Sequence, residues 1–240
     1  MRFPGHLGRL ERPATSTAAT GTSAAPETGR ASTPGNALSG LTADQIATRA
    51  SADLRTASSF RITGSATDAG QKITMNLSVG RKGCAGTLGI KGQGSFTLLM
   101  IGKKLWIKPD DKFWKYAAGS AGTAVLSLVS GKYIEPGSKG SSLGAMAAFC
   151  SPNQFAGSFG SHPAGLVKGV TTTISGQRAL QIKDTADAAS VYVSISARPE
   201  FLRLDGGGNH GHLDFSHYNE PLHLLPPPAS ETLDGARYGF

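Results

Sequence analysis

The chain has 240 residues, a formal net charge of +8 at pH 7 and 39% hydrophobic residues. No segment reaches about 18 consecutive apolar residues, the length that suggests a transmembrane helix. The sequence therefore predicts no helix that spans a membrane. The excess of Lys and Arg favours anionic partners, such as nucleic acid, lipid headgroups or envelope polymers, without choosing among them.

Residues 1–40 differ in composition from the rest of the chain. They are rich in Ala, Ser, Thr, Gly and Pro and carry few large apolar side chains, so folding would bury too little surface to offset the entropy of ordering. We predict that they form a disordered leader. The first residues also lack the basic start and apolar segment of a secretory signal, and we expect no export signal in the chain as written.

A helix is predicted at the start of the folded part. Thr42 and Gln45 have the spacing of a capping box, and Ile46, Ala50 and Leu54 continue as an apolar stripe at helical spacing. This pattern indicates a helix over residues 43–58.

After this helix the apolar residues recur with a period of two, which is typical of strands. The connections are mostly too short for helical crossovers, and this favours antiparallel pairing. Residues 112–165 form an insertion between two groups of strands, with short apolar helices expected at 124–130 and 143–149. The predicted fold class is therefore α+β. The strands are expected at residues 60–62, 73–79, 87–91, 96–101, 104–108, 170–175, 178–183, 190–196, 201–204 and 212–216.

The segment FTLLMIGKKLWIKP indicates a hairpin with unusually many apolar residues. If Gly102 and Lys103 form a two-residue turn, the register is fixed. The second face of the hairpin is then mixed, with Trp106 between two lysines. The first face is wholly apolar and needs a cover of helices or of helices plus a ligand; it carries Phe96, Leu98, Met100, Leu105 and Ile107.

Several alternative sites can be weighed from the sequence. Interleaved lysines and aromatic residues around Trp106 and Trp114 are typical of single-stranded nucleic-acid binding, although packing of both rings is the more common explanation. No catalytic motif is present, and the glycine-rich segment 206–211 lacks the following helix that a dinucleotide site needs. Four clustered histidines match no closed metal-site spacing, so no metal or cofactor is expected; they are His210, His212, His217 and His223.

Cys84 and Cys150 are the two cysteines of the chain. They could be buried free thiols. A disulfide between them would close a long loop, contribute about 4 kcal/mol by the loop-entropy estimate and indicate an oxidising compartment. Such a bridge conflicts with the missing export signal, and both interpretations stay open from the residues alone.

Three segments together resemble the LolA-like superfamily, and within it the LppX/LprG/LprA-type lipoproteins of the actinobacterial envelope. They are IGKKLWIKPDDKFWK, ARPEFLRLDGG and HLDFSHYNEPLHLLPPPASETLD. The resemblance covers residues 41–234 and leaves 235–240 as a C-terminal tail. It implies a large curved antiparallel sheet, or half-barrel, with the N-terminal helix and the helical insertion packed on the concave face. Relatives begin with a signal peptide and a lipobox cysteine, and this chain shows neither.

The resemblance implies a non-enzymatic envelope protein that binds a lipid or acylated ligand in a hydrophobic cavity. Beside it, we expect a monomer, a disulfide between Cys84 and Cys150, and a membrane surface as a further partner. One alternative is an interaction module with a closed core that binds anionic polymers through a basic face. A second alternative is binding of single-stranded nucleic acid. The residues expected to line the cavity are Phe60, Ile62, Met75, Leu77, Phe96, Leu98, Met100, Leu105 and Ile107.

Overall fold

The computed structural model describes residues 37–68, 70–118, 122–137, 143–158, 165–186 and 188–238. Most of the expected leader lies outside these residues, so its disorder stays a prediction. Its last residues, 37–40, form a turn in which Leu38 is buried in the core. Within the expected C-terminal tail, Gly235–Tyr238 forms a short 3-10 helix, η4.

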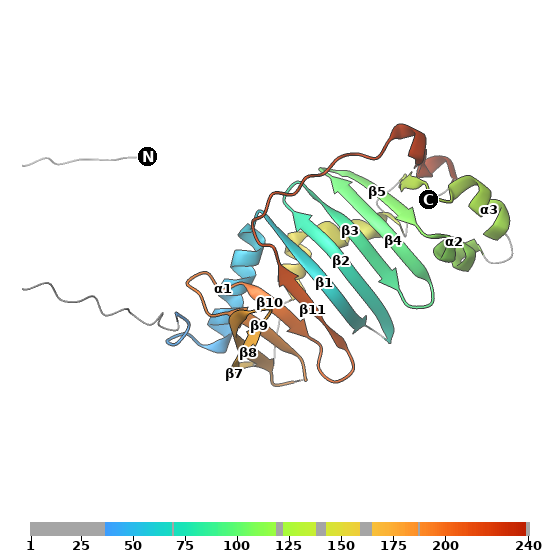
Figure 1. Cartoon of the computed structure of the whole chain (residues 1–240). Coiled ribbons are helices and arrows are strands. Elements are labelled where there is room, and N and C mark those ends of the chain that lie inside the picture. Colours follow the sequence, from blue (N-terminus) through green and yellow to red (C-terminus); the bar gives the residue numbers. More distant parts are fainter. Residues whose placement is uncertain are drawn as a thin grey trace, which may run out of the picture. The chain divides into compact units, whose positions relative to one another are not determined.

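A single twelve-stranded sheet dominates the fold (Figure 1). Its strand order is β12-β6-β5-β4-β3-β2-β1-β11-β10-β9-β8-β7. All neighbours are antiparallel except β12 and β6, which run parallel. The strands are β1 (Ser59–Asp68), β2 (Gln71–Gly80), β3 (Gly83–Ile90), β4 (Gly94–Ile101), β5 (Lys104–Pro109), β6 (Tyr133–Glu135), β7 (Leu166–Ile174), β8 (Gln177–Asp184), β9 (Ser190–Ser194), β10 (Phe201–Asp205), β11 (Gly211–Ser216) and β12 (Thr232–Asp234).

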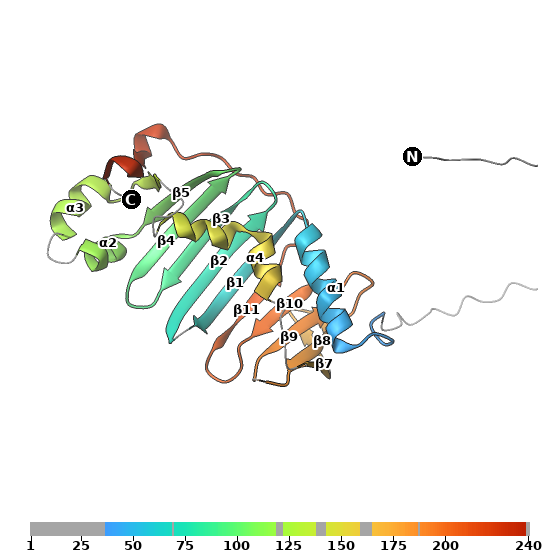
Figure 2. The same ribbon diagram turned by 180° about the vertical axis from the view of Figure 1, so that it is seen from behind.

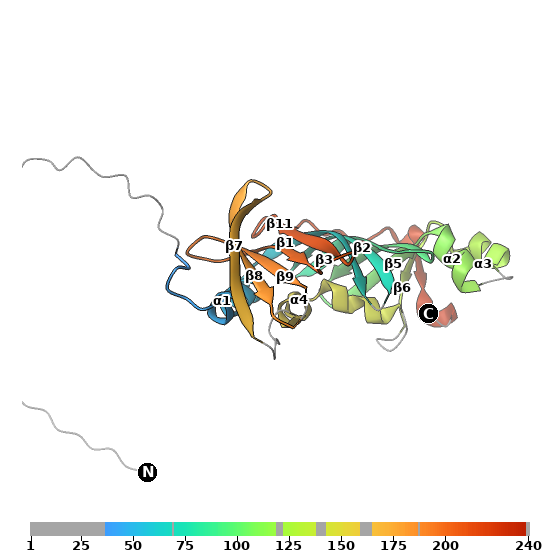
Figure 3. The same cartoon turned by 90° about the horizontal axis from the view of Figure 1, so that it is seen from below.

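Helices cover one face of this curved sheet, which we call the concave face (Figures 2 and 3). Helix α1 begins after the capping box that the sequence predicts, in which the Gln45 N–H donates to Thr42 Oγ1 at 3.2 Å. It contacts α4, β7, β9 and β10. The remaining helices are α2 (Asp111–Ala118), α3 (Gly122–Val129), η2 (Gly144–Cys150), α4 (Pro152–Ser158) and η3 (Ala229–Glu231), and α1 itself spans Ala43–Thr56.

The core lies between the concave face and these helices. Apolar side chains alternate along the strands, so one set faces the helices while Thr, Ser, Asn and Arg side chains occupy the other face. The Phe60 ring contacts Phe155 of α4, with ring centroids 6.1 Å apart. The Phe96 ring contacts Phe113 of α2, with centroids 4.6 Å apart. Helices from the insertion therefore cover strands β1 and β4, which precede it in sequence.

Cys84 and Cys150 form a disulfide, with their Cα atoms 5.2 Å apart. The bridge joins β3 to the last residue of η2 and holds this helix against the concave face. This outcome resolves the two interpretations of the cysteines in favour of the crosslink. Among the described residues, no helix is long and apolar enough to cross a membrane.

Candidate ligand cavity

The β4–β5 hairpin has the register that the sequence predicts. Leu98 is paired with Ile107 and Met100 with Leu105. Gly102 has a φ of 60°, the left-handed conformation that a II′ turn needs at its first central residue and that glycine adopts without strain. The turn therefore places Met100 and Leu105 on the concave face at the end of the hairpin.

A cavity of about 400 Å³ lies at this end, between the hairpin and η2. Its size falls within the range of about 300–1,000 Å³ that is typical of small-molecule sites. The strands supply larger apolar side chains, and η2 supplies only small residues, which leave the space between them unfilled. The cavity is lined by Met100, Gly102, Lys103, Lys104, Leu105, Glu135, Pro136, Gly144, Ala147 and Ala148.

Charged side chains stand where the cavity meets solvent. Lys103 lies in the turn and Lys104 directly follows it, and both are exposed. Lys104 Nζ lies 3.7 Å from Glu135 Oε1 of β6, and both side chains are largely open to water, so this ion pair contributes little to stability. The cavity thus combines apolar walls with a mouth that carries more positive than negative charge.

The nine residues expected to line a cavity fall into two groups. Met100 and Leu105 line the cavity described above. Met75 is partly buried against the core, and the other six are at most 1% exposed, beneath the packed helices. These six are Phe60, Ile62, Leu77, Phe96, Leu98 and Ile107.

Residues from η2, from the end of β6 and from the position after it complete the cavity, and they are not among those predicted from sequence. Glu135 and Pro136 belong to a segment too short to show a strand period. Gly144, Ala147 and Ala148 lie in the sequence SLGAMAAFC, which indicates a helix. The small residues of this sequence could have indicated a cavity, because a helix that presents small side chains to a sheet leaves space between them.

Both tryptophans are buried, contrary to what a nucleic-acid surface requires. Trp114 lies within α2 and is 2% exposed, and Trp106 is 7% exposed. Trp106 borders a second cavity, of about 590 Å³, which shares Glu135 and Pro136 with the first and is also lined by Pro227, Ala229 and Thr232 from the C-terminal segment. Neither ring is available as a platform on which bases stack.

The clustered histidines do not converge. His210 lies in the loop before β11, whereas His212 lies within the strand. His212 Nε2 lies 3.7 Å from Asp214 Oδ2, and His217 Nδ1 lies 2.9 Å from Glu220 Oε2. Across the described ranges, no group of three His, Cys, Asp or Glu side chains is arranged to hold a metal ion. The glycine-rich segment connects β10 to β11, and a strand follows it in place of a helix.

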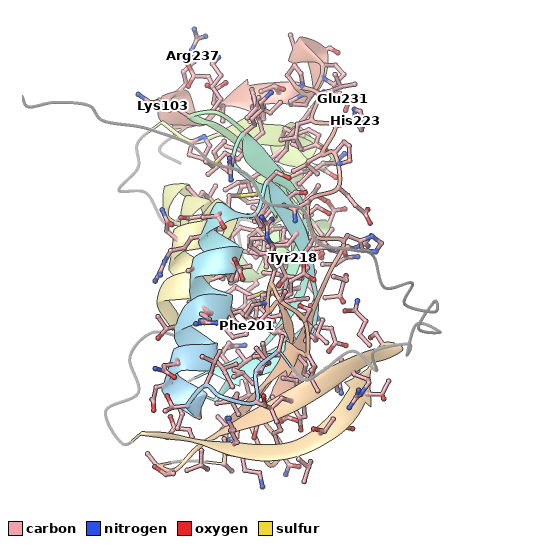
Figure 4. All side chains as sticks on the ribbon, turned by 90° about the vertical axis from the view of Figure 1, so that its left-hand side faces the viewer. Lys103, Phe201, Tyr218, His223, Glu231 and Arg237 are labelled. Carbon is pink, nitrogen blue, oxygen red and sulfur yellow. A yellow bond between two sulfur atoms is a disulfide. The ribbon has the colours of Figure 1, made fainter. Side chains whose placement is uncertain are left out.

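Two titratable groups are perturbed where α1 meets the sheet. Burial, and secondarily the charge of Asp53, raises the pKa of Glu200. Burial also raises the pKa of Tyr218 well above its usual value, with a smaller effect from Glu200. The Tyr218 hydroxyl donates to the Phe201 carbonyl at 2.8 Å (Figure 4). These contacts fix the chain after β11 and lie apart from the residues of the cavity.

Comparison with known proteins shows which fold the chain has, through similarity to solved structures. No protein-family model matches the chain, and no curated protein matches it. The structure is similar to that of LprF from Mycobacterium bovis, with a TM-score of 0.51, 12% sequence identity, and coverage of 77% of this chain and 96% of LprF. The chain has the LolA-like half-barrel fold. The fold predicted from the three sequence segments is thereby confirmed.

Two further structures match with lower scores. The lipoprotein LppX from Mycobacterium tuberculosis has a TM-score of 0.47 at 13% identity, with coverage of 76% of this chain and 98% of LppX. An uncharacterised conserved protein from Thermus thermophilus has a TM-score of 0.38 at 11% identity, with coverage of 80% of this chain and 98% of that protein.

Proposed function

We propose that this half-barrel binds a lipid or acylated ligand and acts as a carrier or sensor without catalysis. The cavity beneath η2 is the observation that carries the proposal. Its walls are Met100, Leu105 and the small residues of η2, which suit an acyl chain. Met side chains adapt to ligands of variable shape.

The mouth of the cavity suits the polar end of such a ligand. Lys103 and Lys104 can donate hydrogen bonds from their ammonium groups to a carboxylate or phosphate, while the acyl chain lies inside. At about 30 Å³ per water-sized group, a space of about 400 Å³ accommodates roughly a dozen methylene groups. That capacity suits one acyl chain better than two.

The nine residues predicted from sequence take two roles in this proposal. Met100 and Leu105 contact the ligand. The six deeply buried residues and Met75 form the core that supports the floor of the cavity. This division follows from the contacts of Phe60 and Phe96 with α4 and α2, which occupy the space above those strands.

We also infer an extracytoplasmic location in the cell envelope. The Cys84–Cys150 disulfide supports it, because such crosslinks persist in oxidising compartments and are rare in the cytosol. Analysis of the intact protein by mass spectrometry, directly after isolation from its native source with free thiols blocked, tests this inference; recovery of both thiols in the blocked form would contradict it.

Uptake of cis-parinaric acid, whose fluorescence rises in an apolar site, tests ligand binding. We expect uptake by the native protein and its loss in Ala147→Trp, because an indole at this position fills the cavity. Ala52→Trp is the matched control, since Ala52 lies on the exposed side of α1. Absence of uptake by the native protein, together with no lipid in its organic extract, would overturn the proposal and favour a closed interaction module.

A further inference from the structure

The mouth of the cavity lies where the turns at one end of strands β2 to β5 carry several basic side chains. The β2–β3 turn holds Arg81 and Lys82, and the β4–β5 turn holds Lys103 beside Lys104. The two turns are adjacent, because the Gly102 N–H donates to the Lys82 carbonyl at 2.7 Å. All four side chains are exposed. We call these four residues the basic edge.

Few acidic groups oppose this charge. Arg81 donates a hydrogen bond to the Thr56 carbonyl, and Lys104 approaches Glu135. Within the described ranges, Lys82 and Lys103 have no ion-pair partner. The opposite edge of the sheet differs, because its turns combine Lys91 and Lys112 with Asp110 and Asp111. The excess of positive charge therefore lies at the end of the sheet that carries the cavity mouth.

The C-terminal segment adds an apolar side chain beside the basic edge. A Cβ placed on Gly83 would lie 3.1 Å from Leu224 Cδ1, so Leu224 packs against the start of β3. Pro227, three residues later, borders the cavity beside Trp106. Leu225 lies between these two anchors and is 80% exposed, so a large aliphatic side chain stands in solvent beside the basic edge.

We propose that this edge docks onto an anionic bilayer surface, with the basic edge against lipid headgroups and Leu225 inserted among them. Clustered lysines and arginines attract anionic membrane surfaces, and an apolar side chain beside them strengthens interfacial binding. Docking in this orientation presents Lys103, Lys104 and the cavity mouth to the bilayer. The role of docking in ligand transfer rests on the proposed function. The evidence for the docking surface is separate, because it consists of the charge and exposure of these side chains. Figure 4 shows Lys103 at the end of the sheet that would meet the membrane.

Vesicle co-sedimentation of the full chain tests this proposal. One set of vesicles contains equal parts of phosphatidylglycerol and phosphatidylcholine, and the other contains phosphatidylcholine alone. We expect binding to the first set only, weakened by added salt because screening acts on exposed charges. Each basic residue near an anionic surface changes binding about fivefold, so Lys82→Glu/Lys103→Glu should reduce it by at least about 25-fold.

The matched control is Lys72→Glu/Lys91→Glu, which makes the same change in net charge on the opposite edge. Both lysines are exposed, and the Lys91 N–H donates to the Lys72 carbonyl at 2.9 Å, which places them together. Retained binding in this variant supports the proposal. Equal loss in both double variants, or equal binding of the native protein to both kinds of vesicle, would overturn it. Binding to soluble polyphosphate with no binding to vesicles would also overturn it, in favour of an anionic polymer.

The docking and ligand-binding proposals fail in different ways. Vesicle binding is measured without added fatty acid, and uptake of cis-parinaric acid is measured without vesicles. Loss of the first with the second intact removes only the docking surface. Leu225→Ser gives an independent check, because it should weaken vesicle binding severalfold without adding or removing charge.

Discussion

Glu200 shows how one side chain can lower the stability of this fold at neutral pH. Its pKa is raised by burial and by Asp53 on α1, so the folded state favours the protonated form. A raised folded-state pKa contributes stability that is fully present below the unfolded value, 4.5, and is lost as the pH rises through the folded value.

Glu200→Gln should therefore raise the free energy of unfolding at neutral pH. The gain should be below about 1 kcal/mol, because water screens a half-exposed carboxylate. It should vanish below pH 4.5, where the native carboxyl is protonated in both states. Urea denaturation at the two pH values measures the effect, and Glu231→Gln serves as the exposed control. A less stable variant at neutral pH would show that the carboxylate has a favourable partner.

At the residue scale, the sequence predicted which residues pair across the β4–β5 hairpin, but it did not predict which distant segments cover a given side chain. The partners of Leu98 and Met100 followed from one turn, because register is a local property. The environment of Trp106 depends on Pro227 and Ala229, more than a hundred residues away in the chain. Alternation with lysines made this ring resemble a binding residue, and the segments that surround it are distant in the chain.

The disulfide is the clearest link between an element and the candidate site. It fixes η2, whose small residues form one wall of the cavity, to β3. Cys84→Ser/Cys150→Ser should lower the free energy of unfolding by about 4 kcal/mol, according to the loop-entropy estimate for a separation of 66 residues. Uptake of cis-parinaric acid should weaken as well, because the wall is no longer held.

Urea denaturation and uptake, each with and without dithiothreitol, measure these two effects. The reductant should shift the native protein towards the behaviour of the double variant and leave the double variant unchanged. Unaltered uptake alongside reduced stability would mean that packing alone positions η2.

At the element scale, long alternating strands were predictable and short or remote ones were not. The period of two located most of the sheet, since each long strand buries one face. It missed β6 and β12, which have three residues each and pair in parallel. It also missed α2, because DKFWK in the sequence suggested a basic and aromatic surface. Trp114 is buried against the core, so this segment packs on the domain as a helix and does not present an aromatic surface.

At the scale of the whole domain, one end of the sheet combines three features from distant parts of the chain. The hairpin and η2 enclose the cavity, the β2–β3 turn adds cations beside its mouth, and the C-terminal segment adds Leu225. The outer face beyond this end is polar and internally paired. There, Arg203 Nε donates to Asp214 Oδ1 at 2.6 Å. The proposed exchange of ligand with a membrane needs this asymmetry, because only the end with the cavity should approach the surface.

Ligand binding at this end should stabilise the domain as a unit, because the cavity walls belong to the same core as α1 and the sheet. A ligand that binds only the folded state, present at 100 times its dissociation constant, raises the free energy of unfolding by about 2.7 kcal/mol. Thermal unfolding followed by circular dichroism, with and without cis-parinaric acid, should show this as a higher midpoint. Ala52→Trp should respond as the native protein does, and Ala147→Trp should not respond. An equal rise in Ala147→Trp would place the fatty acid elsewhere, and the cavity beside Trp106 would then be the site to examine.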